Sequence, residues 1–244
     1  MSYDVIGDIH GHYEKLLALL QSLGYRKREG AFRHPNGRQA IFLGDLIDRG
    51  PLQEEVLYTV RDMIDAGTGR CIMGNHEWNA IGYFTPIGGG EYGKARNAKN
   101  LKHHHVFLDQ VGLDSARHKA WVEWFKTLPP FLDLGGIRVA HACWRESEIA
   151  TIQAGMHEGK LTDRFLAESF VKKPAPTAAR PGSASRSHAA LPETNGSVRV
   201  ATTPHTSVSA SAGTRAKSER MAKSRVRKPG EFTYGREVSW FRES

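Results

Sequence analysis

The sequence has only two cysteines among 244 residues, Cys71 and Cys143. Both lie in or beside apolar stretches typical of strands, where a buried, reduced thiol is the usual state. No apolar run approaches the ~20 residues that a membrane-spanning helix needs. The amino terminus enters a predicted strand by residue 3, which leaves no room for a secretory signal. We therefore expect a soluble, cytoplasmic protein that has no membrane partner.

Aromatic and acidic residues are missing or scarce in one part of the chain. Residues 174–230 contain no Phe, Trp or Tyr and hold 10 Lys+Arg against 2 Asp+Glu, whereas residues 1–173 hold 22 against 21. The formal net charge of +8 thus belongs to one segment, so nucleic acid is expected as a partner only through that segment. Its composition cannot bury enough apolar area to offset the cost of ordering the chain. We predict a domain over 1–173, a disordered basic segment over 174–230 and a short tail over 231–244.

Three short apolar runs each end in glycine followed by polar residues. The motifs are Gly7-Asp8-Ile9-His10-Gly11, Gly44-Asp45-Leu46-Ile47-Asp48-Arg49-Gly50 and Gly74-Asn75-His76-Glu77. Taken singly, each motif is more often an ordinary turn, in which glycine adopts an unusual φ and the polar residue caps the backbone. Taken together, they place carboxylates, imidazoles and an amide after successive strands, where open α/β sheets keep their ligand crevice. The sequence therefore predicts that the three motifs converge on one site.

The segments between and after the motifs predict an α/β fold. Helical spacing of apolar residues is found in 13–24, 51–66, 97–111 and 115–128. Strand and helix alternate through the first two of these, which is typical of a largely parallel sheet with flanking helices. The last two predict a helical insertion over the mouth of the site, preceded by a flexible loop at 86–93. Residues 131–141 predict a β-hairpin with a Gly-Gly turn that ends on His141.

The three motifs resemble the signatures of the calcineurin-like metallophosphoesterases, Gly-Asp-x-His-Gly, Gly-Asp-x-x-Asp-Arg-Gly and Gly-Asn-His-Glu, and more particularly those of the phosphoprotein phosphatase branch. The resemblance covers about residues 3–145. It implies a layered β-sheet with flanking helices. It also implies a hydrolase that cleaves phosphomonoesters, most like a Ser/Thr phosphoprotein phosphatase, with a hydroxide activated by two metal ions.

The resemblance carries a metal-binding role to five residues of this chain. They are Asp8, His10, Asp45, Asn75 and His141, with Asp45 as the bridge between two divalent ions. Oxygen and nitrogen donors of this kind suit Mn, which is the first choice, and also Fe, Zn or Ni. His141 departs from the family pattern, because Ala142 and Cys143 follow it where the family has Gly.

Substrate and acid roles follow from the same resemblance. Arg49, whose planar guanidinium suits bidentate contact with phosphate, and Asn75 would bind the substrate. His76 would be the general acid for the leaving oxygen, and Asp48 would orient the imidazole of His76. A phosphorylated protein or a small phosphoester is the expected substrate.

The family supplies one more metal-binding histidine from a later strand, and this sequence has no clear equivalent. His205 is the least poor candidate. Two explanations stay open for residues 174–230: a native linker or polyanion-binding arm, or a reading-frame slip near Lys173. The slip predicts that the second ion is bound weakly and that the chain is poorly active, and translation of the gene in its other frames tests it.

Several other features have simpler interpretations. The tract His103-His104-His105 is expected to be a solvated helix face, because consecutive helical residues point in different directions and cannot hold one ion. The aromatic residues at helical spacing within 115–128 are also expected in the core: Trp121, Trp124 and Phe125.

Two alternatives to a phosphoprotein phosphatase remain. One is a dinucleoside polyphosphate hydrolase, like the related symmetrical diadenosine tetraphosphatases. Those enzymes tend to have Asp in place of Glu77, so Glu77 favours the phosphoprotein phosphatases. We therefore expect a phosphopeptide to be hydrolysed faster than a dinucleoside tetraphosphate. The other is a catalytically impaired protein whose basic segment binds nucleic acid.

Overall fold

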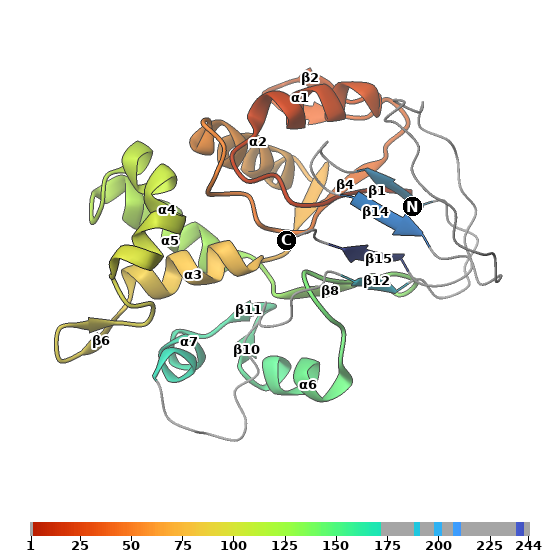
Figure 1. The fold of residues 1–244 in the computed structure, drawn as a ribbon. Helices are drawn as coiled ribbons and strands as arrows, with labels where there is room; N and C mark the ends of the chain where they lie inside the picture. Colours follow the sequence, from red (N-terminus) through yellow and green to blue (C-terminus); the bar gives the residue numbers. More distant parts are fainter. Residues whose placement is uncertain (1, 172–187, 191–197, 202–206, 211–237, 242–244) are drawn as a thin grey trace, which may run out of the picture.

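The structure, a computed structural model, describes residues 2–171, 188–190, 198–201, 207–210 and 238–241. Two β-sheets form its centre (Figure 1). In the first, four parallel strands lie in the order β13 (Val198–Ala201), β1 (Tyr3–Ile6), β4 (Gln39–Phe42) and β5 (Gly69–Cys71). In the second, five antiparallel strands lie in the order β14 (Ser207–Ala210), β15 (Val238–Phe241), β12 (His188–Ala190), β9 (Arg138–Ala140) and β8 (Phe131–Asp133). The predicted α/β class is confirmed.

The two sheets pack face to face because apolar residues alternate along the parallel strands. One face carries Tyr3, Val5, Ile41, Leu43 and Ile72, which pack with Ile137 and Val139 near β9. Successive strand residues point to opposite faces, so Ile6, Ala40 and Phe42 join a different core cluster. Both faces of β1 and β4 are therefore buried, and the buried Asp4 within β1 is bonded to Arg38 and Tyr25.

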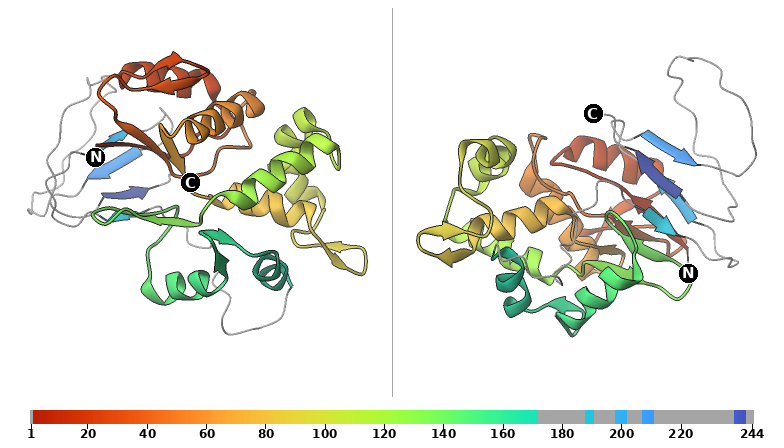
Figure 2. Two further views of the ribbon diagram at one scale, coloured as in Figure 1. Left: turned by 180° about the vertical axis from the view of Figure 1, so that it is seen from behind. Right: turned by 60° about the horizontal axis from the view of Figure 1, so that its bottom comes forward.

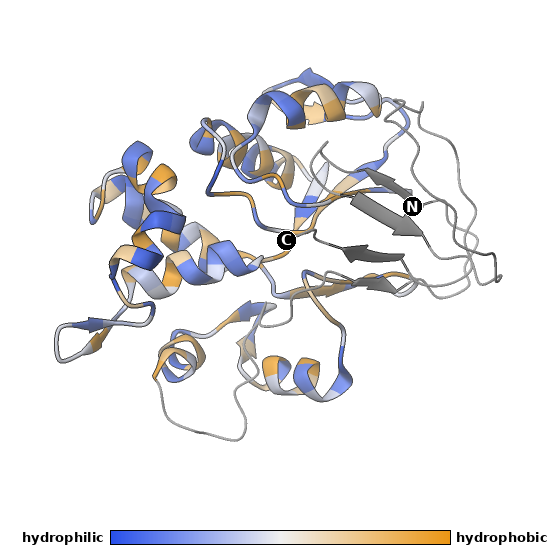
Figure 3. Cartoon of the chain, viewed as in Figure 1, coloured by the Kyte–Doolittle hydropathy of each residue, from blue (hydrophilic) through white to orange (hydrophobic). Residues whose placement is uncertain are grey.

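Helices α1 (Tyr13–Ser22) and α2 (Gln53–Asp65) cover the second face of the parallel sheet. Figure 2 shows them on the side of that sheet away from β8. Each helix has a buried apolar stripe, Leu16 and Leu20 in α1 and Val56, Leu57, Val60 and Met63 in α2. The rest of each helix is more hydrophilic (Figure 3). Both predicted helices are confirmed.

A helical unit lies beside the sheets and contains α3 (Asn75–Phe84), α4 (Ala98–Val111) and α5 (Ala116–Thr127) (Figure 1). Trp121 and Phe125 of α5 are buried, as predicted, whereas Trp124 is only partly buried and packs against the same core. The chain continues through α6 (Glu146–Ala154), the small sheet of β10 (Met156–His157) and β11 (Lys160–Leu161), and α7 (Asp163–Phe170). Phe170 packs on Trp78 of α3 with ring centroids 4.8 Å apart, so this last part is anchored to the helical unit.

The prediction of a flexible loop at 86–93 is wrong. Strands β6 (Pro86–Gly88) and β7 (Glu91–Tyr92) form an antiparallel hairpin there. Its turn uses Gly88, Gly89 and Gly90, all with positive φ, a conformation that glycine adopts without steric cost. The run of glycines that suggested flexibility is what allows the turn. Another two-stranded hairpin, β2 (Arg26–Arg28) with β3 (Ala31–Arg33), precedes β4.

The predicted basic segment 174–230 is described only in part. Three of its stretches, β12, β13 and β14, pair with the two sheets, which differs from the expectation that the whole segment stands apart from the fold. Backbone pairing of such short strands needs no aromatic side chain. His205 and most of the segment lie outside the described residues, so the boundary at 173 stays a prediction. Among the described residues, no helix combines the length and apolar character needed to cross a membrane.

His118 of α5 is a buried histidine inside the helical unit. Its ring contacts Phe84 of α3 and Phe107 of α4 at 4.9 and 5.8 Å between centroids. Its Nδ1 accepts a hydrogen bond from the backbone N–H of Asp114. Burial, helped by the nearby His104, lowers the pKa of His118 from 6.5 to about 4, although the charge of Asp114 opposes this shift. Folding therefore favours the neutral ring.

We expect this histidine to make stability depend on pH between 6.5 and 4. In that window the unfolded imidazole takes up a proton and the folded one does not, so the free energy of unfolding falls as the pH falls. Between pH 7 and pH 5 the loss is about 2 kcal/mol. Urea unfolding of the chelator-treated protein measures this change. The free energy of unfolding should fall less between these two pH values in His118→Asn than in the wild type. His103→Asn, at an exposed site, should keep the wild-type dependence of the free energy of unfolding on pH. The same dependence in His118→Asn would contradict the prediction.

Candidate metal centre

The three motifs lie after β1, β4 and β5 and meet at one edge of the parallel sheet. Gly44 has φ +84°, and a Cβ on it would lie 2.2 Å from the backbone nitrogen of Gly74. Only glycine lets these two loops approach so closely. His10, Asp45, Asp48 and Arg49 also have positive φ, between 49° and 73°. Non-glycine residues in that region cost energy and cluster at functional sites, which marks these loops as the candidate site.

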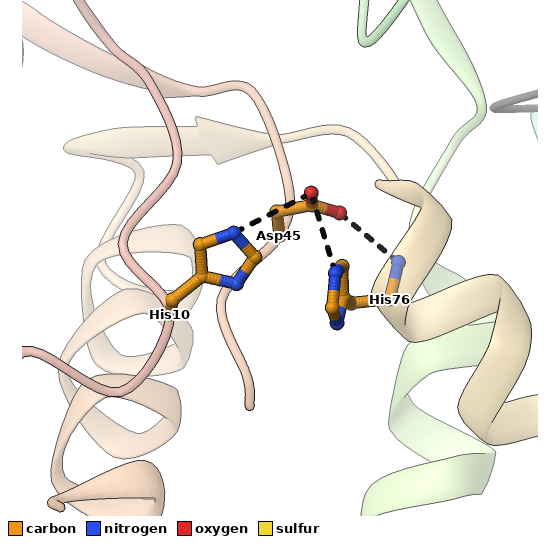
Figure 4. Close-up of side chains that lie close together, drawn as sticks. All are labelled: His10, Asp45 and His76. Atoms are coloured by element: carbon orange, nitrogen blue, oxygen red, sulfur yellow. Dashed lines mark hydrogen bonds and ion pairs between the residues drawn. The ribbon is translucent and has the colours of Figure 1, made fainter. Parts of the chain in front are cut away.

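The Asp45 carboxylate is at the centre of the cluster (Figure 4). Its Oδ1 accepts a hydrogen bond of 3.0 Å from the backbone N–H of His76, in the first turn of α3. Its Oδ2 lies 3.8 Å from His10 Nε2, 3.4 Å from His141 Nε2 and 4.0 Å from His76 Nε2. One oxygen is therefore fixed by the helix, and the other faces three imidazole nitrogens.

Backbone carbonyls orient two of these rings. His10 Nδ1 bonds the carbonyl of Ile47 at 2.8 Å, and His141 Nδ1 bonds that of Leu43 at 2.7 Å. A carbonyl can only accept, so each Nδ1 carries a proton and each Nε2 is the nitrogen left to face a metal. His10 Nε2 is buried and has no hydrogen-bond partner in the described part of the chain. Histidines held in this way are typical metal ligands.

The remaining predicted ligands complete the set. Asp8 Oδ2 lies 3.8 Å from His10 Nε2, and Asn75 Oδ1 lies 3.1 Å from His141 Nε2. Two overlapping groups, one of His10, Asp45 and His76 and the other of Asp8, Asp45 and His141, have ligand atoms within 4.8 Å of one another. Carboxylate, imidazole and amide donors suit Mn and related divalent ions. The residues present therefore fit a centre with Asp45 in common.

Metal binding at this site is coupled to the protonation of its histidines. Burial lowers the pKa of His10 from 6.5 to about 4, so this ring is neutral and ready to bind a metal at pH 7. Burial also disfavours the charged form of His141, but the charge of Asp45 and the hydrogen bond to it outweigh that effect and raise the pKa of His141 to about 10. A metal at this position must displace a proton, so its affinity falls as the pH falls.

His76 and Asp48 form a pair beside the cluster. His76 Nδ1 lies 2.5 Å from Asp48 Oδ2, and this contact leaves Nε2 directed to the side of Asp45. Burial disfavours the imidazolium, but the bond to Asp48 and the charges of Asp45 and Asp48 outweigh it and raise the pKa of His76 to about 9. The ring is thus protonated at pH 7, and it can donate a proton from Nε2.

The prediction that His103-His104-His105 is wholly solvated is wrong for its middle residue. His103 and His105 are exposed, but His104 is buried, and its Nδ1 lies 2.9 Å from Asp48 Oδ1. The signal was present in the sequence, because His104 shares helical spacing with the buried residues Phe107, Leu108 and Val111. The helix therefore has one apolar face that contains a histidine.

Two further buried residues were not recognised as supports of the site. The Glu77 carboxylate is fully buried and accepts hydrogen bonds from the backbone N–H groups of Asp45, Leu46 and Gly74 at 2.8–2.9 Å. It lies behind the loops and is not placed to contact a substrate, so it gives no basis for choosing between substrates. Gln53 Oε1 accepts a bond of 2.6 Å from the N–H of Asp48.

Among the predicted site residues that the structure describes, Arg49 is the one whose side chain is not connected to the others by a hydrogen bond or ion pair. Its side chain is exposed, and no carboxylate among the described residues pairs with it. An exposed guanidinium next to Asp48 in sequence remains available for a phosphate, and this role stays a prediction. His205 lies outside the described residues, so the predicted last ligand is untested.

Curated relatives share part of this chain. A protein from Halalkalibacterium halodurans, named bis(5'-nucleosyl)-tetraphosphatase PrpE [asymmetrical], is 45% identical over 76 residues, which are 31% of each chain. The protein of that name from Oceanobacillus iheyensis is 32% identical over 144 residues, 58% of this chain and 56% of its own length. The matched part thus spans between about a third and about half of these relatives.

Among solved structures, a protein serine/threonine phosphatase from Saccharomyces cerevisiae, described as similar to human phosphatase PP5, has a TM-score of 0.30. It is 18% identical, and the match covers 54% of this chain and 38% of that one. Likeness at this level carries no argument, and the assignment rests on sequence. The family described as calcineurin-like phosphoesterase matches residues 1–179. The chain, with its three motifs meeting around Asp45, therefore belongs to the calcineurin-like phosphoesterases.

Proposed function

We propose that the protein is a phosphoesterase that needs two divalent ions, held by Asp8, His10, Asp45, Asn75 and His141. The observation that carries the proposal is the Asp45 carboxylate, which turns one oxygen toward three imidazole nitrogens and lies beside the pair of His76 and Asp48. When bound, two such ions lower the pKa of a shared water and neutralise the charge of a phosphoryl group. Mn is the proposed metal.

The chain's own residues supply the proton for the leaving group and the orientation of the substrate. His76 Nε2 lies 4.0 Å from Asp45 Oδ2, so a phosphoryl group beside Asp45 has its leaving oxygen within reach of that N–H. Asp48 holds His76 by Nδ1 and keeps the other nitrogen as the donor. Arg49 would contact the phosphoryl oxygens with its guanidinium, assisted by the side chain of Asn75.

Dinucleoside polyphosphates are the substrate class that we put first, because the curated relatives at 32% and 45% identity carry that activity in their names. Phosphomonoesters, including phosphoserine and phosphothreonine in proteins, are the second candidate. A specific observation favours them: His76 is protonated and firmly held, and a general acid matters most when the leaving oxygen is strongly basic.

A hydrolysis assay tests both candidates. We expect chelator-treated protein to be inactive on p-nitrophenyl phosphate and to regain activity with added Mn. With Mn, diadenosine tetraphosphate should be cleaved faster per enzyme than a phosphopeptide. The opposite preference would select the second candidate. An absence of hydrolysis, together with DNA binding that weakens steeply with salt, would instead favour the third view, an impaired enzyme whose basic segment binds nucleic acid.

A further inference from the structure

The proposed function leaves the buried histidine of α4 unused. His104 is 6% exposed, whereas its neighbours in the tract, His103 and His105, are exposed. Burying a polar ring is costly unless it gains a partner, and the partner of His104 is the side chain that also holds His76.

Asp48 is held by one imidazole at each of its two oxygens. Its Oδ2 is 2.5 Å from His76 Nδ1, and its Oδ1 is 2.9 Å from His104 Nδ1. The carboxylate is 3% exposed, so water does not compete strongly for either oxygen. Two bonds fix the rotation of the carboxylate plane, whereas one bond would leave it free to turn. The direction of the His76 ring therefore depends on both bonds.

The surroundings of His104 fix its own ring. It contacts Tyr83 of α3 and Phe107 of α4, with centroid distances of 5.3 and 5.2 Å. Its Nε2 is buried and has no hydrogen-bond partner in the described part of the chain. The ring thus has a single polar contact, and since a carboxylate accepts, Nδ1 is the donor.

The same helix also supports the loop that contains Asp48. Gln110 Oε1 accepts a bond of 2.8 Å from the backbone N–H of Gln53, and its Nε2 donates one of 2.6 Å to the carbonyl of Pro51. Since Gln53 in turn bonds the N–H of Asp48, α4 holds the loop through its backbone and the carboxylate through His104. The helical insertion is therefore more than a cover over the site.

We propose that His104 is a positioning residue that acts through Asp48 to hold His76 in the orientation needed for proton donation to the leaving group. The inference rests on the proposed role of His76 as the acid. In this role His104 does not touch the substrate. Its replacement should therefore lower kcat most on substrates whose leaving oxygen needs a proton. It should leave metal binding and substrate binding nearly unchanged.

The first test compares His104→Phe with His103→Asn on two phosphomonoesters in the presence of Mn. His104→Phe should lower kcat on an alkyl phosphate by about 10- to 100-fold, the usual effect of a residue that orients a functional group. On p-nitrophenyl phosphate, whose leaving group needs no proton, kcat should change by less than about 3-fold. KM and metal content should stay constant, and His103→Asn should match the wild type. His104→Gln, whose amide can donate to Asp48, should recover part of the loss.

Three results would overturn the proposal. The first is an equal loss of kcat on both substrates, and the second is no loss of kcat on either. The third is that His104→Phe lowers kcat as much in His76→Asn as in the wild type, because the effects of residues that act as a unit are not additive. If His104→Phe does not fold, His104→Gln carries the same comparison with a smaller expected loss.

A second test does not depend on activity and separates this proposal from the proposed function. In metal-free protein labelled with 15N, NMR detects the Nδ1 proton of His76, assigned by its disappearance in His76→Asn. The signal should be shifted or lost through exchange in His104→Phe and unchanged in His103→Asn. An unchanged signal in His104→Phe overturns the positioning role even if the wild type is fully active. An inactive wild type with the expected NMR change would refute the phosphoesterase proposal alone.

Discussion

Replacing Asp45 by asparagine is expected to lower both the metal content and the turnover of the protein. Its Oδ2 faces the imidazole Nε2 atoms of both His10 and His141, so an amide nitrogen there removes an anionic donor that the two histidines share. Loss of a residue that only orients a ligand already costs about 10- to 100-fold in affinity or activity. We therefore expect kcat/KM to fall by at least about 100-fold.

The design of this variant separates metal loss from misfolding. Asparagine tolerates the positive φ of 52° at this position, and its Oδ1 can still accept the N–H of His76. Metal content after dialysis, kcat/KM and the circular dichroism spectrum are measured together. Asp109→Asn, the same change at an exposed site of α4, should retain both ions and full activity. Two retained ions with normal turnover in Asp45→Asn would contradict the bridging role.

The glycine-terminated motifs were informative because their chemistry is local. In each, an apolar strand ends, a glycine allows a tight turn, and the polar residue must follow the strand's carboxyl end. Parallel pairing then brings Asp8, Asp45 and Asn75 to one edge, since neighbouring parallel strands end together. Sequence reasoning could therefore place these residues without knowing the rest of the fold.

His104 could not be placed in the same way because its role depends on packing between distant elements. It lies 56 residues from Asp48 in the chain, and nothing in a tract of three histidines shows which one faces inward. The helical spacing of the buried residues of α4 selects His104. Its partner, Asp48, is apparent only once α4 packs against the loop after β4. The role of Glu77 depends on such packing too: the resemblance linked it only to substrate choice, whereas its oxygens accept hydrogen bonds from the backbone N–H groups of the loops.

Replacing His76 by asparagine is expected to produce a defect that depends on the leaving group. His76 Nε2 is the proposed proton donor, and proton donation by a positioned side chain typically contributes 10²- to 10⁴-fold. We expect kcat/KM on an alkyl phosphate to fall within about that range, whereas p-nitrophenyl phosphate should be affected far less. Metal content should stay near the wild-type value, because the predicted ligands are unchanged.

The same variant also discriminates between the two substrate classes. The leaving oxygen of a dinucleoside polyphosphate belongs to a phosphate, which is weakly basic, so its departure needs little help from an acid. His76→Asn should therefore retain much more activity on diadenosine tetraphosphate than on a phosphoserine peptide. Equal losses on all substrates would mean that His76 serves metal binding, as its place in the group with His10 and Asp45 would allow. Normal turnover of the alkyl phosphate would remove the acid role, and with it the reason for Asp48 to hold this ring.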